Sequence, residues 1–219
     1  MDIVGDLRRA FPSRLAHPGW LLAASATWMA GWAWLVSRHR GPLALDVRAD
    51  SLLAVNAHWQ DIGLWLLGIE SPLHVTFATG VVAAISVSLR DVRFAAAVLA
   101  GVAAEIASVQ WAIKPLVGRH EIAPGLSFPS SYVGAVVALM TVAVMHFLPS
   151  GPLARRLSSR LLHALAASVT VVGVLDVVVV SVAAIVTGGH LLSDVVAVIP
   201  WGVAVPWFWL ACLGYLSGG

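Results

Sequence analysis

A histidine and an aspartate near the end of the chain have the types and the spacing to act together in catalysis. His190 and Asp194 stand four residues apart in the run Gly188-Gly189-His190-Leu-Leu-Ser193-Asp194. Side chains four apart share one face of a helix, so the carboxylate could accept the imidazole Nδ1–H and leave Nε2 free. A histidine held in this way can act as a nucleophile or a general base. The simpler alternative is a hydrogen-bonded pair at a helix end.

Two cations earlier in the chain have the chemistry of a phosphate-binding site. Lys114 and Arg119 stand five residues apart in a run that ends Gly118-Arg119-His120-Glu121. Ammonium and guanidinium groups bind phosphate oxygens through charge-assisted hydrogen bonds. The alternative is an ordinary positive rim at the end of an apolar segment.

A third segment supplies hydroxyl groups at the start of another apolar run. Ser127-Phe128-Pro129 is followed by three polar residues, Ser130, Ser131 and Tyr132. Ser127 is a suitable N-cap and Pro129 suits a first helical turn. The free N–H groups and the dipole of such a helix start favour an anion. The alternative is capping without any ligand.

The composition indicates that membrane helices must position these groups. The chain has 219 residues, of which 59% are hydrophobic and 11% are charged. A soluble domain carries about 25% charged residues. The composition therefore excludes a nucleic-acid-binding arm and an ordinary cytosolic enzyme. It indicates one integral membrane domain over residues 1–219, all-α in class, because nothing alternates with the period of a barrel strand.

A helix that crosses the hydrocarbon needs roughly 20 mostly apolar residues. Six stretches qualify, at about 19–36, 73–89, 94–113, 130–148, 164–187 and 195–216. The first is expected to be a retained helix, with a signal peptide as the alternative. Residues 51–69 are expected to form an amphipathic helix at the interface, with a short seventh span broken at Glu70 and Pro72 as the alternative.

The distribution of arginine and lysine gives an orientation. One side would carry Arg8, Arg9, Arg14, Arg90, Arg93, Arg155, Arg156 and Arg160, and the other Arg38, Arg40, Arg48, Lys114 and Arg119. The side with more cations should be cytoplasmic. Both termini are then cytoplasmic, and the three segments described above face outward from the cell inner or plasma membrane.

Together the three segments resemble the type 2 phosphatidic acid phosphatase family of membrane lipid phosphatases. The family signature is K-x6-R-P, then P-S-G-H, then S-R-x5-H-x3-D. This chain has it in degenerate form over roughly residues 70–205, with "SFPSSY" in place of "SFPSGH" and "GGHLLSDVV" in place of "GVHYPSDVL". The resemblance implies six transmembrane helices and an outward-facing site.

The resemblance also implies a role for each matching residue. Lys114 would bind phosphate, and Ser130 would donate to a phosphoryl oxygen. His190 would attack phosphorus and form a phosphohistidine, and Asp194 would orient His190. The expected phosphate-binding residues are Lys114, Arg119, Ser130, Ser131 and Tyr132. Cofactors and metals are not required in that chemistry.

The implied substrate is a phosphorylated lipid in the membrane, either a polyprenyl phosphate or diphosphate or a phosphatidate-like lipid. Nucleic acid is not an expected partner, and the sequence indicates no protein partner.

The chain departs from the signature at several positions. Glu121 stands where the family has arginine, Tyr132 replaces the histidine that protonates the leaving group, and Ala183-Ala184 replaces the Ser-Arg pair. General acid catalysis contributes about 10²–10⁴-fold to a rate. His120 is the expected replacement for the proton donor, with Tyr132 and Glu121 as alternatives.

These departures leave other functions open. The chain could be a catalytically impaired relative that binds lipid phosphate or serves as an accessory subunit. It could also ionise a prenyl diphosphate. A transporter is less attractive because the sequence shows no internal repeat. Glu105 and Asp176 lie inside predicted spans, where an acid is costly and usually has a partner or a function. We expect both to be protonated and hydrogen-bonded structural groups, with pairing to a site cation or lining of a polar cavity as the alternatives.

Overall fold

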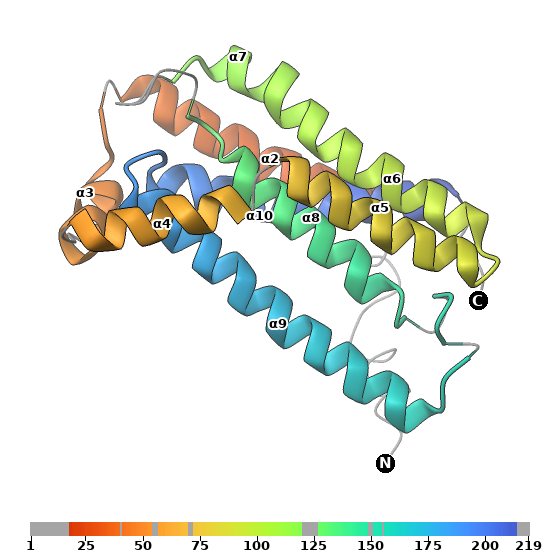
Figure 1. The fold of residues 1–219 in the computed structure, drawn as a ribbon. Coiled ribbons are helices and arrows are strands. Elements are labelled where there is room, and N and C mark those ends of the chain that lie inside the picture. Colours follow the sequence, from red (N-terminus) through yellow and green to blue (C-terminus); the bar gives the residue numbers. More distant parts are fainter. Residues whose placement is uncertain are drawn as a thin grey trace.

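Helices make up all of the secondary structure in the part of the chain that the structure describes (Figure 1). The computed structural model describes residues 18–39, 41–53, 57–69, 72–119, 127–148, 151–154 and 156–213. In chain order the helices are α2 (Pro18–Arg38), α3 (Ala44–Leu53), α4 (Ala57–Ile69), α5 (Pro72–Ser88), α6 (Val92–Ala107), the π-helix η1 (Ser108–Ile113), α7 (Lys114–Val117), α8 (Ser131–Met145), α9 (Ser159–Val186) and α10 (Leu192–Cys212).

The helices lie where the sequence predicted apolar spans. Within the described residues, three stretches are long and apolar enough to cross a membrane: Val92–Val117, which joins α6, η1 and α7, then α9, then α10. α4 and α5 are bent by 41° relative to each other and together give one further, broken candidate. α8 is a shorter apolar helix of 15 residues. The protein is therefore an all-α integral membrane protein, and the count of six spans stays a prediction.

The amphipathic helix expected at 51–69 is divided in the structure. α3 ends at Leu53, and α4 begins at Ala57 and packs against α9. The contact is close at Gly63, where an added Cβ would lie 2.9 Å from Thr187 Cγ2. α4 is thus a packed element of the bundle, and its depth in the membrane stays a prediction.

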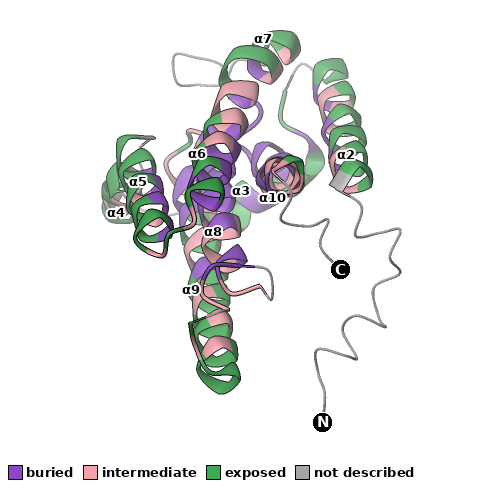
Figure 2. Ribbon diagram, turned by 90° about the vertical axis from the view of Figure 1, so that its right-hand side faces the viewer, coloured by how far each residue is buried: buried purple, intermediate pink, exposed green. Residues whose placement is uncertain are grey.

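α10 is the central helix of the bundle and packs against α8, α6 and α2 (Figure 2). Glycines allow these helices to approach closely, as small residues do in membrane bundles. A Cβ at Gly101 of α6 would lie 2.8 Å from Pro206 Cα, and a Cβ at Gly202 of α10 would lie 2.8 Å from Val137 Cβ. The core therefore depends on the absence of side chains at these positions.

α2 is fastened to α10 at a proline. Pro200 lacks the N–H that would bond to the carbonyl of Val196 four residues earlier. Trp28 of α2 donates its Nε1–H to that carbonyl at 3.2 Å, and Ser25 Oγ donates to the carbonyl of Pro200 at 3.1 Å. The proline that interrupts the hydrogen bonding of α10 thus creates the attachment point for α2.

A buried polar pair lies at the far end of α8. His146 Nε2 is 2.7 Å from Ser86 Oγ, and His146 Nδ1 is 2.9 Å from the carbonyl of Val142. The imidazole also packs edge-on against Phe94, with ring centroids 4.4 Å apart. This pair joins α5, α6 and α8 at the end of α8 opposite its N-terminus.

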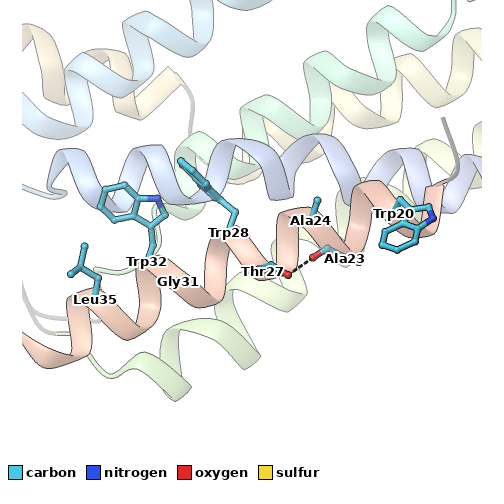
Figure 3. Close-up of a pocket in the computed structure, with 8 residues that line it drawn as sticks. All are labelled: Trp20, Ala23, Ala24, Thr27, Trp28, Gly31, Trp32 and Leu35. Atoms are coloured by element: carbon cyan, nitrogen blue, oxygen red, sulfur yellow. Dashed lines mark hydrogen bonds between the residues drawn. The ribbon is translucent and has the colours of Figure 1, made fainter. Parts of the chain in front are cut away.

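An apolar cavity of about 700 Å³ lies along one side of α2 (Figure 3). It is lined by Trp20, Ala23, Ala24, Thr27, Trp28, Gly31, Trp32 and Leu35. The hydroxyl of Thr27 donates to the carbonyl of Ala23 within the same helix. The lining offers hydrocarbon contacts and no charged group.

Candidate functional site

The three segments singled out from the sequence meet at one end of the bundle. α7 ends there, α8 and α10 begin there, and α9 finishes beside α3 (Figure 1). Lys114 contacts Ser131, Arg119 contacts Asp194, and the backbone N–H of Ser130 donates to the carbonyl of Asp194 at 3.1 Å. These hydrogen bonds connect residues up to 75 positions apart in the sequence and bring the three segments into one site.

His190 lies in the short connection between α9 and α10. The turn at its start needs a left-handed residue, which Gly188 supplies with φ of +70°. The His190 N–H then donates to the carbonyl of Ala184 at 3.1 Å, and its side chain is buried. The imidazole is thus held in place mainly through its own backbone.

The predicted hydrogen bond between His190 and Asp194 is absent from the structure. Nδ1 of His190 lies 3.8 Å from Asp194 Oδ2 and is buried without a hydrogen-bond partner. The prediction assumed that both residues lie on one helix, but α10 begins only at Leu192. The carboxylate is therefore close enough to act on the imidazole electrostatically, but it makes no hydrogen bond with Nδ1.

Asp194 is occupied by other partners. Its Oδ2 accepts the N–H of Leu191 at 3.0 Å, which caps the start of α10, and its Oδ1 accepts a hydrogen bond from Arg119 Nη1 at 2.9 Å. The residue is fully buried. A carboxylate near a helix N-terminus is stabilised by the helix dipole.

Arg119 is paired with a second buried acid that the sequence analysis did not single out, Asp46 of α3. Arg119 Nη2 lies 3.5 Å from Asp46 Oδ2, and Arg119 Nη1 also donates to Ser193 Oγ at 2.9 Å. Asp46 Oδ1 accepts the N–H of Ser193 at 2.8 Å. Arg119 thus ties α3 to the start of α10, and its charge is balanced by two carboxylates.

A local signal for Asp46 is present in the sequence. Leu43-Ala-Leu-Asp46 and Leu191-Leu-Ser-Asp194 share the pattern Leu-x-x-Asp. In both, the aspartate accepts the backbone N–H of the leucine that precedes the helix. This is one half of a capping box. The pattern indicates two helix starts, although it does not indicate that they face each other.

Lys114 is placed by an irregular helix. The π-helix η1 precedes it and changes the direction in which later side chains leave the helix, a feature often found at functional sites. Its Nζ donates to Ser131 Oγ at 3.3 Å, and its side chain is buried. Among the described residues, Lys114 makes no ion pair with a carboxylate, which distinguishes it from Arg119.

The serines lie at the N-terminus of α8, but the expected cap is wrong. The N-cap is Ser130, whose Oγ accepts the N–H of Val133 at 3.5 Å. Ser127 was expected in that role, yet its N–H donates to the carbonyl of Arg119 and its buried Oγ has no partner. The cap lies three residues later because α8 begins only at Ser131.

Tyr132 lies beside His190. The two rings meet edge to face with centroids 6.3 Å apart. His120 and Glu121, the other candidates for proton donor, lie outside the described residues.

Ala183 and Ala184 are buried near the end of α9. The close approach of α4 at Gly63 reaches the backbone of Ala183, with an added Cβ lying 3.5 Å from its carbonyl oxygen. The α9 segment therefore supplies small side chains and a carbonyl to the site, and no cation from these two positions.

Glu105 lies in the core of the bundle and makes no hydrogen bond to a site cation in the described structure. It is fully buried in α6, and neither carboxyl oxygen has a partner. Gly134 of α8 is in direct contact with it, since a Cβ there would collide with Glu105 Oε1. Asp176 is half-buried in α9, and it makes no hydrogen bond to the carboxyl oxygens of Glu105. The alternative that Glu105 pairs with a site cation is therefore not supported, since neither of its carboxyl oxygens has a partner.

The bundle of membrane helices has the fold of a PAP2-type lipid phosphatase. One solved structure with this fold is the first transmembrane PAP2-type phosphatidylglycerolphosphate phosphatase from Bacillus subtilis. The two structures agree with a TM-score of 0.66 over 86% of this chain and 94% of the other, at 12% sequence identity. Neither a family model nor a curated protein matches the sequence.

Proposed function

We propose that the protein is a membrane lipid phosphatase or phosphotransferase that acts on a phosphorylated lipid through His190. The observation that carries the proposal is the meeting of a buried imidazole, the ammonium of Lys114 and the hydroxyl-bearing N-terminus of α8 in one site. The PAP2-type fold supports it. The substrate would be a polyprenyl phosphate or diphosphate, or a phosphatidate-like lipid.

The phosphate would be bound at the start of α8. The N-terminal N–H groups and dipole of a helix favour an anion. The hydroxyls of Ser130 and Ser131 and the Nζ of Lys114 add donors on the same side. Donors fixed before the reaction stabilise the charge on the transferring phosphoryl group.

The chemistry would take place in two steps. In the first, the lone pair of His190 Nε2 forms a bond to phosphorus while the bond from phosphorus to the leaving oxygen breaks, and that oxygen leaves with a proton, on the lipid for a monophosphate or on the lipid phosphate for a diphosphate. In the second, water attacks phosphorus and gives a proton to the group that protonated the leaving oxygen, the nitrogen–phosphorus bond breaks, and inorganic phosphate is released. Asp194, 3.8 Å from Nδ1, would stabilise the positive charge on the ring between the two steps.

The proton for the leaving lipid would come from His120, with Tyr132 as the second candidate because its ring contacts His190. A lipid diphosphate has a better leaving group than a monoester and depends less on this proton. His120→Ala should therefore reduce hydrolysis of a monophosphate more than hydrolysis of a diphosphate. Unchanged activity in His120→Ala would assign the proton to another group.

A second candidate function is binding of a lipid phosphate without turnover. The pairing of Arg119 with Asp46 and Asp194 favours it, because this guanidinium is already neutralised. Ala183 and Ala184 also favour it, because these two positions supply no cation to bind the transferring phosphoryl group.

Phosphate release from a panel of lipids separates the two candidates. The purified protein would be given phosphatidate, phosphatidylglycerol phosphate, a polyprenyl phosphate and a polyprenyl diphosphate. The proposal expects release of inorganic phosphate by the wild type, none by His190→Ala, and full activity in His163→Ala, an exposed histidine of α9 that serves as the matched control. Binding without release in wild type and in His190→Ala alike would establish the second candidate.

A further inference from the structure

Asp46 is a fully buried carboxylate that makes its contacts with residues of the site rather than with its own helix alone. It accepts hydrogen bonds from Leu43 N at 2.9 Å, Ser193 N at 2.8 Å, Ser193 Oγ at 3.0 Å and Arg119 Nη2 at 3.5 Å. A carboxylate can accept about four hydrogen bonds, so its capacity is filled. Three of the four donors belong to Ser193 and Arg119, both of which are in contact with Asp194 or adjacent to it.

We infer that Asp46 is a positioning residue of the proposed active site, which holds Arg119 and the start of α10 so that Asp194 and His190 keep their places. The kinetic part of this inference rests on the proposed function. Asp46 lies on α3, a helix that supplies none of the residues assigned to phosphate binding or to phosphoryl transfer. It acts through Arg119 and Ser193 and does not itself touch the substrate.

The geometry gives two routes from Asp46 to Asp194. Through the backbone, Asp46 Oδ1 fixes the N–H of Ser193, the residue before Asp194. Through side chains, Asp46 Oδ2 fixes Arg119, whose Nη1 donates to Asp194 Oδ1. Removal of the carboxylate would leave a buried N–H without an acceptor, which is costly enough to move the start of α10.

The charges indicate a second effect of Asp46. Arg119 with Asp194 alone would form a neutral pair, whereas Arg119 with both aspartates carries a net charge of about −1 by formal count. Lys114 also interacts electrostatically with Asp194, so the two aspartates balance two cations near His190, which becomes positive when it carries the phosphoryl group. Asp46 thereby preserves the favourable field of Asp194 that the guanidinium would otherwise cancel. Loss of Asp46 should slow turnover more than it weakens binding.

The kinetic test is a double-mutant cycle with Asp46→Asn and Arg119→Gln, with rates expressed per functional site by the amplitude of the phosphoenzyme burst. Asp46→Asn should lower kcat by about 10- to 100-fold, which is typical of a group that orients the residues in direct contact with the substrate. It should change KM by less than about threefold. If Asp46 acts in part through Arg119, adding Asp46→Asn to Arg119→Gln should lower kcat by a smaller factor than Asp46→Asn does in the wild type. Full and equal effects in both backgrounds would overturn the side-chain route.

The matched control is Asp50→Asn, an exposed acid one turn further along α3. It should leave kcat and KM unchanged. Equal losses in Asp46→Asn and Asp50→Asn would assign the effect to α3 in general and overturn the inference.

A measurement that does not depend on activity tests the backbone route. Hydrogen–deuterium exchange of the peptide that covers 188–195 should be faster in Asp46→Ala than in wild type and unchanged in Asp50→Ala. Unchanged exchange in Asp46→Ala would overturn the inference even in an active protein. If the wild type releases no phosphate from any lipid, the proposed function fails, and this exchange experiment still decides whether Asp46 positions the site.

Discussion

Asp46 and Asp194 occupy the same position at the start of two different helices, and both reach Arg119. Each accepts the N–H of the leucine three residues before it and contacts the guanidinium with a carboxylate oxygen, at 3.5 Å for Asp46 and 2.9 Å for Asp194. The arginine is thereby part of the framework of the site. Lys114 is left as the described cation of the site without such a carboxylate partner.

Ser193 links the two aspartates, and its removal should destabilise the protein. Its Oγ donates to Asp46 Oδ2 at 3.0 Å and accepts from Arg119 Nη1 at 2.9 Å, with the residue fully buried. Ser193→Ala removes both bonds and leaves charged groups with fewer partners, at a cost of about 1–3 kcal/mol. We expect a lower midpoint of thermal unfolding in detergent, whereas Ser51→Ala, on the exposed side of α3, should leave it unchanged. Equal midpoints for Ser193→Ala and wild type would contradict this.

Trp28→Phe should loosen α2 from α10. The substitution removes the indole N–H that satisfies the carbonyl freed by Pro200, while most of the apolar contact is kept. We expect a loss of about 1 kcal/mol, measured as a fall in the thermal midpoint. Trp20→Phe is the matched control because Trp20 is exposed on the same helix. If both variants unfold at the same temperature, the bond to Val196 does not contribute to stability.

Gly134→Ala should be strongly destabilising. The added methyl group would collide with Glu105 Oε1 and lie 2.8 Å from Val198 Cγ2, in a part of the core that is fully buried. Overpacking of a core costs about 1–3 kcal/mol. Gly80→Ala on α5 has open space around its Cβ and should be tolerated. Partial rescue of Gly134→Ala by Glu105→Ala would identify the carboxylate as the obstacle, and equal stability of the two glycine variants would contradict the contact.

The proposed orientation places α3 and the site outside the cytoplasm. A single cysteine introduced as Arg48→Cys in a Cys212→Ser background should react with a membrane-impermeant thiol reagent added to intact cells, since Arg48 is exposed on α3. A cysteine introduced as Arg156→Cys, on the side predicted to be cytoplasmic, should react only after the cells are opened. The reverse pattern would place the site on the cytoplasmic face.

Much of the fold could be predicted from the sequence because membrane helices are specified locally. Apolar runs predict α5, α8, α9 and α10 within a few residues, since each run must satisfy its own backbone in lipid. The π-helix before Lys114 could not be predicted, because nothing in the run from Ser108 to Ile113 differs in kind from an α-helical segment. Its first residue is held by a long-range contact, the bond from Trp201 Nε1 to Ser108 Oγ at 2.8 Å, which local sequence does not record.

The site could be predicted in part. The segments that hold Lys114, Ser130 and His190 carried recognisable residue types, and the structure brings them together. Asp46 was missed because its role depends on a pairing across 147 residues, which neither spacing nor composition records. The hydrogen bond between His190 and Asp194 was wrongly expected because the four-residue spacing applies within a helix, and His190 precedes one.

Trapping of a phosphoenzyme tests the central claim most directly. Purified protein would be mixed with a lipid phosphate labelled on phosphorus, quenched within one turnover and separated from lipid under denaturing conditions. A phosphohistidine at His190 predicts label on the wild-type protein that survives base and is lost in acid, and no label on His190→Ala. Rapid phosphate release by wild type and His190→Ala alike, or acid-stable label retained in His190→Ala, would contradict the account.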